Sequence, residues 1–167
     1  MKSQITIKKI QELLIKGVQT IYVDDDTSRR MWWASLEVIQ RDFLSQNYKQ
    51  GGIWVASPLP AFNDKKFLNQ LHGWLWSPEG FPYFQNENAG FLPVNNSEKI
   101  KKDFDLVSNY KVLNLCQEDG YEPFLMIITP NFQCVLSIVG EKDKKILLMK
   151  CDEESLKLSI ELMHAKL

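Results

Sequence analysis

Apolar residues at the start of the chain recur at the three- and four-residue spacing of an amphipathic helix. The apolar positions are Ile5, Ile7, Ile10, Leu13 and Leu14. The positions expected to point largely outward are Lys8, Lys9, Gln11, Glu12 and Lys16. A glycine then follows at position 17, where it is a common helix stop. The pattern therefore predicts a first helix that ends at Gly17.

The next stretch, residues 17–33, has the pattern of a strand, a turn and the start of a helix. Residues 20–23 are rich in β-branched and aromatic side chains, which is typical of a short strand. An acidic triplet at 24–26 follows, and we expect a long helix over 28–48. Its apolar face comprises Met31, Trp32, Leu36, Ile39, Phe43 and Leu44.

Two further strands are predicted in the middle of the chain. Residues 51–60 begin with a glycine pair and end with prolines, which cannot continue a hydrogen-bonded ladder. Residues 73–76 predict the next strand, and residues 62–71 a short helix before it. The order helix, strand, helix, strand indicates a right-handed crossover between 20–23 and 51–60, and hence at least one parallel pair.

The C-terminal part of the chain, beyond a helix predicted at 98–107, has the pattern of strands alone. These strands are expected at 110–115, 123–129, 133–139 and 145–149. The links between the last three are too short to hold a crossover helix, so they are expected to form antiparallel hairpins.

A final helix is predicted over residues 152–167. It is acidic at its start and basic near its end, as the helix dipole favours. Leu156, Ile160, Met163 and Leu167 form one apolar seam along it. This seam can pack on the sheet, pair with a second copy, or continue as a signalling helix that leads to an output module in a longer parent chain.

Together these elements predict an α/β fold with an α+β tendency, built as a single domain over residues 1–167. We expect one mixed sheet of about six to seven strands with helices packed on it. The N-terminal half contributes a βαβ unit, and the C-terminal half contributes antiparallel hairpins.

Composition and charge exclude several classes of protein. The chain is 44% hydrophobic and 25% charged, which is ordinary globular composition. Lys and Arg number 20 against 21 Asp and Glu, so the overall charge gives no reason to expect binding to nucleic acid. No uninterrupted apolar run reaches the roughly 18 residues of a membrane span, and no secretory signal is evident, so the chain is expected to be cytoplasmic without membrane insertion.

The cysteines give no sign of a metal centre. Cys116, Cys134 and Cys151 are odd in number, widely separated, and inside or beside apolar strand-like runs. A metal site needs ligands paired at short spacing, so we predict reduced, buried thiols, no bound metal and no cofactor.

The acidic triplet, Asp24, Asp25 and Asp26, is the first candidate site. Carboxylates before a helix accept hydrogen bonds from its free N–H groups and suit the positive end of its dipole. A strand that ends in acidic residues is also typical of response-regulator receiver domains, in which paired carboxylates bind magnesium. A receiver needs a phosphoacceptor aspartate after a later strand, and residues 71–79 contain none, so helix capping is the favoured interpretation.

The second candidate is an aromatic cluster around the predicted strand at 73–76. Trp74 and Trp76 share one strand face by the two-residue period, and a loop at 78–93 carries further aromatic residues. Three interpretations remain open for this loop: folding over the core, covering a ligand cavity, or contacting a partner. The candidate ligand or partner residues are Trp74, Trp76, Phe81, Tyr83, Phe84 and His72. Core packing is the favoured role of the tryptophans themselves.

One stretch resembles a known family. Residues 119–140, with a polar lead-in, the strand Pro123-Phe124-Leu125-Met126-Ile127-Ile128-Thr129-Pro130 and a following hairpin, are similar to DICT-type input domains of bacterial, especially cyanobacterial, signalling proteins. The resemblance spans about residues 14–162. It implies a sensory domain that precedes a histidine-kinase or cyclic-dinucleotide output module, and it brings no catalytic residues with it.

Three functional hypotheses follow. The first is a non-catalytic sensory or regulatory input domain of a two-component system, acting by ligand or protein binding, with a homodimer through the C-terminal helix or an output kinase module as partner. The second is a stand-alone protein-interaction adaptor. The third is a degenerate receiver-like domain, or a small enzyme built from His72, Asp24 and Asp25. The chain lacks the nucleotide-binding boxes and the phosphoacceptor histidine of a complete kinase.

Overall fold

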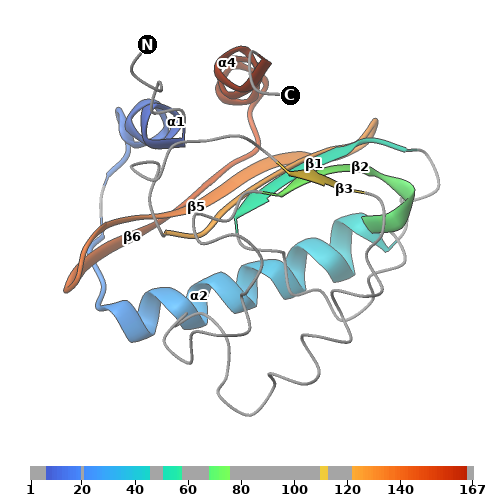
Figure 1. The fold of residues 1–167 in the computed structure, drawn as a ribbon. Helices are drawn as coiled ribbons and strands as arrows, with labels where there is room; N and C mark the ends of the chain where they lie inside the picture. Colours follow the sequence, from blue (N-terminus) through green and yellow to red (C-terminus); the bar gives the residue numbers. More distant parts are fainter. Residues whose placement is uncertain are drawn as a thin grey trace.

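The computed structural model describes residues 7–19, 21–45, 51–57, 68–75, 110–112 and 122–164. Within these residues the chain forms an α/β domain in which a mixed sheet lies between two helical layers (Figure 1). The first and last helices lie side by side on one face of the sheet, and a long helix covers the other face. The predicted fold class, a single domain with helices packed on one mixed sheet, is confirmed.

Apart from residues 20–23, the elements found follow the predicted order. The helical segments are α1 (Ile7–Ile15), α2 (Asp25–Val38), its π-helical continuation η1 (Ile39–Leu44), a 3-10 turn η3 (Leu68–Gln70) and α4 (Glu153–His164). The strands are β1 (Ile53–Ser57), β2 (His72–Leu75), β3 (Tyr110–Val112), β4 (Phe124–Ile128), β5 (Gln133–Glu141) and β6 (Lys144–Lys150). Each of these strands overlaps a predicted one. The helix predicted at 98–107, and most of the one at 62–71, lie outside the described residues.

The sheet has a parallel half and an antiparallel half. Its strand order is β3-β2-β1-β4-β5-β6. β1 pairs in parallel with β2, and β2 in parallel with β3, while β1–β4, β4–β5 and β5–β6 are antiparallel. The predicted hairpins are therefore present, and the sheet is partly parallel as predicted, although its parallel pairs are β1–β2 and β2–β3. Within the described part of the chain, β3 and β6 form the two edges of the sheet.

The strand predicted at 20–23 is wrong. Within the described residues of this stretch, Val23 forms a single antiparallel bridge to Lys145 of β6, and Ile21 and Tyr22 are 79% and 58% exposed. The crossover predicted from this stretch to β1 is therefore also wrong, because β1 lies between β2 and β4. A β-branched run favours a strand only where neighbouring strands can pack against it and bond to it. Here the chain only crosses the sheet edge on its way from α1 to α2.

One face of the sheet is covered by α1 and α4. The buried apolar residues on this side are Ile7, Ile10, Leu14, Val55, Phe124, Met126, Val135, Ile146, Leu148, Leu156 and Met163. They include the seam residues Leu156 and Met163 of the last helix, with Ile160 packed beside them. Of the three roles left open for that seam, packing on its own domain is the one found.

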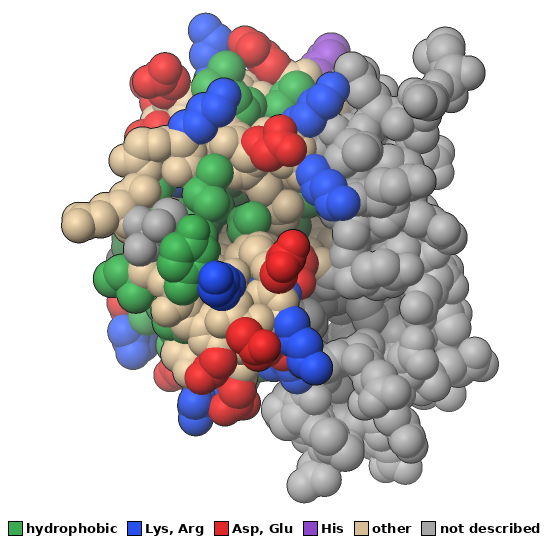
Figure 2. All heavy atoms as spheres, turned by 90° about the vertical axis from the view of Figure 1, so that its left-hand side faces the viewer, with side chains coloured by type: hydrophobic (Ala, Val, Ile, Leu, Met, Phe, Trp, Pro, Cys, Tyr) green, Lys and Arg blue, Asp and Glu red, His purple; other side chains and the backbone are tan. Residues whose placement is uncertain are grey.

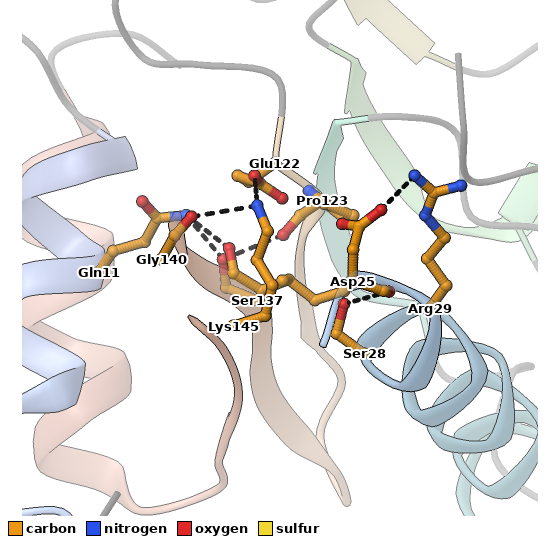
Figure 3. A network of polar contacts seen from close by, with 10 residues as sticks. Gln11, Asp25, Ser28, Arg29, Glu122, Pro123, Ser137, Gly140 and Lys145 are labelled. Carbon is orange, nitrogen blue, oxygen red and sulfur yellow. Dashed lines mark hydrogen bonds and ion pairs between the residues drawn. The ribbon is translucent and has the colours of Figure 1, made fainter. Parts of the chain in front are cut away.

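A buried glutamine on this side corrects another prediction. Gln11 was expected to face outward, but its side chain is buried against β5. Its Nε2 donates to Ser137 Oγ at 2.8 Å, and Ser137 Oγ donates to the Pro123 carbonyl at 3.0 Å (Figure 3). A buried polar group needs such partners, and these partners are brought together only by the fold. Its spacing from Ile7 and Leu14 already places residue 11 on the buried face of α1, and only its polar side chain suggested the solvent.

The other face is covered by α2 and η1. Its buried residues are Trp32, Leu36, Ile39, Leu44, Trp54, Ala56, Leu68, Leu71, Leu75, Leu125, Ile127, Phe132, Cys134, Leu136 and Ile138. The helix widens at its end, where Ser45 N–H donates to the Gln40 carbonyl, a π-type bond. Of the predicted apolar face, Met31 and Phe43 are instead partly exposed.

Candidate interaction edge

β6 is an edge strand, and among the described residues only Val23 pairs with its outer side. Lys145 N–H donates to the Val23 carbonyl at 2.8 Å, and Val23 N–H donates to the Lys145 carbonyl at 2.9 Å. Successive residues of a strand point their backbone groups to alternate sides, so those of Leu147 and Met149 face outward like those of Lys145. An edge with open N–H and C=O groups can add another strand.

Exposed apolar side chains lie along this edge. Ile21 and Tyr22 precede the Val23 bridge, and Met149 of β6 is 40% exposed. Figure 2 views the molecule from the side of the β5–β6 hairpin and the start of α2, and it shows several apolar side chains exposed on this face with charged groups among and around them. Exposed apolar residues gathered beside an open strand are typical of a contact surface.

β6 begins and ends with a lysine, and an acidic helix terminus follows it. Lys144 begins the strand and is exposed, whereas Asp152, Glu153 and Glu154 are exposed where the chain enters α4. The side chain of Asp152 is the N-cap of that helix, since Ser155 N–H donates to its Oδ1 at 2.8 Å. This hydrogen bond holds the pKa of Asp152 below its ordinary value. The strand is therefore basic at its start and is followed by an acidic helix terminus.

The acidic triplet caps α2, as favoured from the sequence. Thr27 N–H donates to Asp24 Oδ1 at 2.6 Å, so Asp24 is the N-cap and the helix begins at Asp25, three residues earlier than expected. Asp25 forms an ion pair with Arg29.

We predict a pH dependence from the Asp24 cap. The hydrogen bond from Thr27 N–H holds the pKa of Asp24 below its ordinary value of 3.8. A carboxylate with a lowered folded-state pKa stabilises the fold above its ordinary pKa, and this contribution is lost as pH falls through the folded-state value. The melting temperature should therefore fall between about pH 5 and pH 2, and Asp24→Asn should flatten part of that fall. Circular dichroism melts at a series of pH values measure this change in melting temperature, with Asp143→Asn on the exposed hairpin as control. Equal pH profiles for the two variants would contradict the capping role of Asp24.

The structure does not bring the proposed catalytic groups together. His72 is exposed as the first residue of β2, and β1, β4 and β5 separate that strand from the β6 edge near Asp24 and Asp25. The site suggested for a small enzyme is therefore wrong. The receiver-like arrangement is also wrong, because the acidic triplet follows an antiparallel bridge at the sheet edge and not a parallel strand.

The aromatic candidates are only partly within the described residues. Trp74 is half-buried in β2 and packs against the core on the α1 and α4 side, which fits the favoured packing role. Trp76, Phe81, Tyr83 and Phe84 lie outside the described residues, as does the loop at 78–93. The three interpretations of that loop stay predictions.

Sequence reasoning missed a buried lysine at the edge. The Lys145 side chain is 6% exposed, and its Nζ donates to a Glu122 carboxylate oxygen and, at 3.0 Å, to the Gly140 carbonyl (Figure 3). A buried ammonium needs such a counter-charge. Lys145 thus contacts Glu122 and the β5–β6 hairpin through its side chain, and Val23 through its backbone. The only sequence signal was its position beside the hairpin turn.

The cysteines divide into a buried and an exposed thiol. Cys134 is buried in β5, and burial raises its pKa; Cys151, just after β6, is exposed, so the prediction of burial is wrong for it. Cys116 lies outside the described residues. Within the described part of the chain, no three or more His, Cys, Asp or Glu side chains are grouped so that they could hold a metal ion. No helix in that part is long and apolar enough to cross a membrane.

The fold and the edge define a three-layer α/β domain with an open antiparallel edge strand. The chain belongs to the family described as Domain of unknown function (DUF8628), whose model matches residues 8–167. Comparison with curated proteins gave no match, and comparison with solved structures gave none either.

Proposed function

We propose that this chain is a non-catalytic regulatory input domain that acts through the association of two copies along β6. The observation that carries the proposal is the open outer side of β6 beside exposed apolar residues. Leu147 and Met149 offer four outward backbone groups on a strand that pairs on that side with Val23 alone among the described residues. A second copy presents the same strand, so it is a self-complementary partner.

The Val23 bridge selects the register of the pair. A two-fold axis at Met149 places Met149 opposite its counterpart and Leu147 opposite Cys151 of the other copy. In this register the residue of the second copy that would face Lys145 belongs to the start of α4, where the chain leaves the sheet. Val23 therefore keeps its hydrogen bonds to Lys145. A register centred on Leu147 would need the backbone groups of Lys145 that Val23 already uses. Antiparallel pairing at Met149 therefore satisfies the open groups without unfolding the edge.

Charge favours the same arrangement. Antiparallel pairing brings Lys144 of one copy toward the acidic entry of α4 in the other, where Glu153 and Glu154 are exposed. The contact occurs twice because of the two-fold symmetry. Opposite charges at the rim of an interface set its orientation and speed association more than they add affinity.

The sensory role rests on the resemblance to DICT-type input domains, and the dimer contact differs from the one first expected. The seam of the C-terminal helix packs on its own sheet, with Leu156 and Met163 buried, so we place the contact on β6 instead. β6 leads directly into α4. An association at Met149 thus lies next to the helix that would connect to an output module in such a signalling protein.

The test is the oligomeric state of Met149→Lys. Wild-type protein should be a dimer by analytical ultracentrifugation. The variant places two ammonium groups at the two-fold axis and should raise the dimer Kd by about 30-fold or more, the scale for losing a central interface residue. Circular dichroism melts should stay close to wild type, because this side chain is already partly exposed.

Leu158→Lys is the matched control. Leu158 is 39% exposed, nearly the same as Met149, and belongs to α4 instead of the edge strand. It should leave the dimer intact. A wild-type chain that stays monomeric at about 0.1 mM, far above the Kd of a specific dimer, would overturn the proposal. That result would favour the adaptor hypothesis, with Ile21 and Tyr22 as the place to look for its partner.

A further inference from the structure

Two cysteines flank the last residue pair of the β5–β6 ladder. The register pairs Val135 with Lys150, Leu136 with Met149 and Ser137 with Leu148. One step further along the same antiparallel register places Cys134 of β5 opposite Cys151. Both are free thiols.

The backbone hydrogen bonds of Ile138 and Lys145 indicate the kind of pair they form. Ile138 N–H donates to the Pro123 carbonyl, on the β4 side, so Cys134, four residues earlier, also directs its backbone groups toward β4. Lys145 directs its backbone groups away from β5 to Val23. Cys151 comes six residues later, directly after the last residue of β6, and the alternation extended by one residue gives it the same direction. The two cysteines therefore occupy a non-hydrogen-bonded position. There the Cα atoms lie about 4.5 Å apart, within the range of about 4.4–6.8 Å that a disulfide spans.

The two side chains also share one face of the sheet. Cys134, Leu136 and Ile138 all belong to the core under α2, and residues directly opposite each other point to the same side. Burial raises the pKa of the Cys134 thiol, and the nearby charge of Cys151 raises it further, which agrees with this position.

We propose that Cys134 and Cys151 are a redox modification site that closes to an intrachain disulfide. The site is independent of the dimer proposed above, since it rests on the register within one chain. In the two-fold pair Cys151 lies opposite Leu147 and not opposite another cysteine, so the bond joins residues of the same copy.

A low-molecular-weight disulfide such as glutathione disulfide is the oxidant. The exposed Cys151 loses its proton to water, and its thiolate attacks one glutathione sulfur; a protein–glutathione disulfide forms and one glutathione leaves as thiolate. The Cys134 thiolate then attacks Cys151 Sγ and expels the second glutathione. The protein gives up two electrons and two protons, and glutathione disulfide is reduced to two glutathione molecules.

The surroundings make this a slow reaction that base accelerates. Burial, followed by the negative charge of Asp152, raises the pKa of Cys151, and burial raises that of Cys134 further. Only the thiolate attacks, so the rate of closure should rise about tenfold per pH unit below these pKa values. The closed bond would fix the end of β6 and the N-cap of α4 to β5.

The experiment uses the full chain with Cys116→Ser. Trypsin leaves positions 116 and 134 on one peptide, so this substitution makes the linkage unambiguous. After incubation with glutathione disulfide, intact-mass spectrometry should show the loss of two hydrogen atoms, and non-reducing digestion should link the Cys134 peptide to the Cys151 peptide. Adding Cys151→Ser should abolish both signals.

Three results would overturn the site. The first is a glutathione adduct on Cys151 that stays and is never displaced by Cys134. The second is a folded protein whose mass does not change although both thiols react once it is unfolded, and the third is a disulfide between two copies. The same reaction on Met149→Lys separates the two proposals. Closure in a monomeric variant supports the redox site even if the dimer proposal fails, and a dimer that never closes rejects the redox site alone.

Discussion

Trp54→Ala should lower the free energy of unfolding by about 3–5 kcal/mol, the usual cost of removing a buried aromatic side chain. Trp54 lies in β1, at the centre of the sheet order, and is 0% exposed. Its ring lies near Tyr110 of β3, with centroids 6.4 Å apart, and its Nε1 donates to the Leu68 carbonyl at 3.4 Å. Truncation leaves a cavity that rigid neighbouring strands cannot close.

Gly73 shows how closely this ring is packed. A Cβ atom added at Gly73 of β2 would overlap the indole of Trp54, so only a glycine fits beside it. The indole of Trp54 thus occupies the space that a side chain at position 73 would need. Gly73→Ala in the wild-type background should therefore also destabilise the fold, whereas in the Trp54→Ala background the added methyl group enters the cavity and should cost less.

Urea unfolding followed by circular dichroism measures both effects. Trp33→Ala is the control for Trp54→Ala, since Trp33 is only partly buried at the rim of the same core cluster. It should cost clearly less. A Trp54→Ala variant as stable as Trp33→Ala would show that the cavity closes, and it would contradict the packing described here.

The part of the fold that the sequence predicted best is the part held by local contacts. β4, β5 and β6 are successive strands joined by short turns, so their apolar runs and turn residues determine both the strands and their pairing. The N-caps Asp24 and Asp152 are equally local, because each bonds an N–H group three residues later.

The failures that change the fold and the site concern partners that are distant in the sequence. Val23 has the composition of a strand, yet its bonding depends on Lys145, more than a hundred residues later. Gln11 stands on the buried face of α1 by its spacing from Ile7, but the partner that makes a buried glutamine possible, Ser137, is more than a hundred residues away. Strand order also depends on distant residues, since the residues of a strand do not determine which strands will lie beside it.

The candidate site was missed for this reason. The acidic triplet and the aromatic cluster attracted attention because their composition is unusual, whereas β6 reads as an ordinary strand. It becomes a candidate surface only because it is last in the strand order. The placement of Cys134 opposite Cys151 likewise needs the register of β5 and β6, although both strands were predicted.

The ion pair between Lys145 and Glu122 gives the second large prediction. Glu122→Gln should lower the free energy of unfolding by about 2 kcal/mol, less than the 3–5 typical of a fully buried pair, because the Glu122 side chain is 31% exposed. The loss arises because the Lys145 ammonium, 6% exposed, keeps its charge but loses its counter-charge. An exposed ion pair offers the control. Asp26 Oδ2 and Arg30 Nη2 lie 3.0 Å apart at the surface, and Asp26→Asn, which breaks this pair, should lower the free energy of unfolding by under about 0.5 kcal/mol.

A double-mutant cycle separates the charge from the packing. Lys145→Met keeps an apolar stem in place of the buried cation, and combined with Glu122→Gln it removes both charges. The double variant should be more stable than Glu122→Gln alone, with a coupling energy of about 1–2 kcal/mol. Because Lys145 also holds Val23 through its backbone, which both variants keep, the cycle isolates the side-chain pair. If Glu122→Gln were as stable as wild type and the double variant less stable, the ammonium would be held by the Gly140 carbonyl and solvent, and the ion pair would contribute nothing to this edge of the sheet.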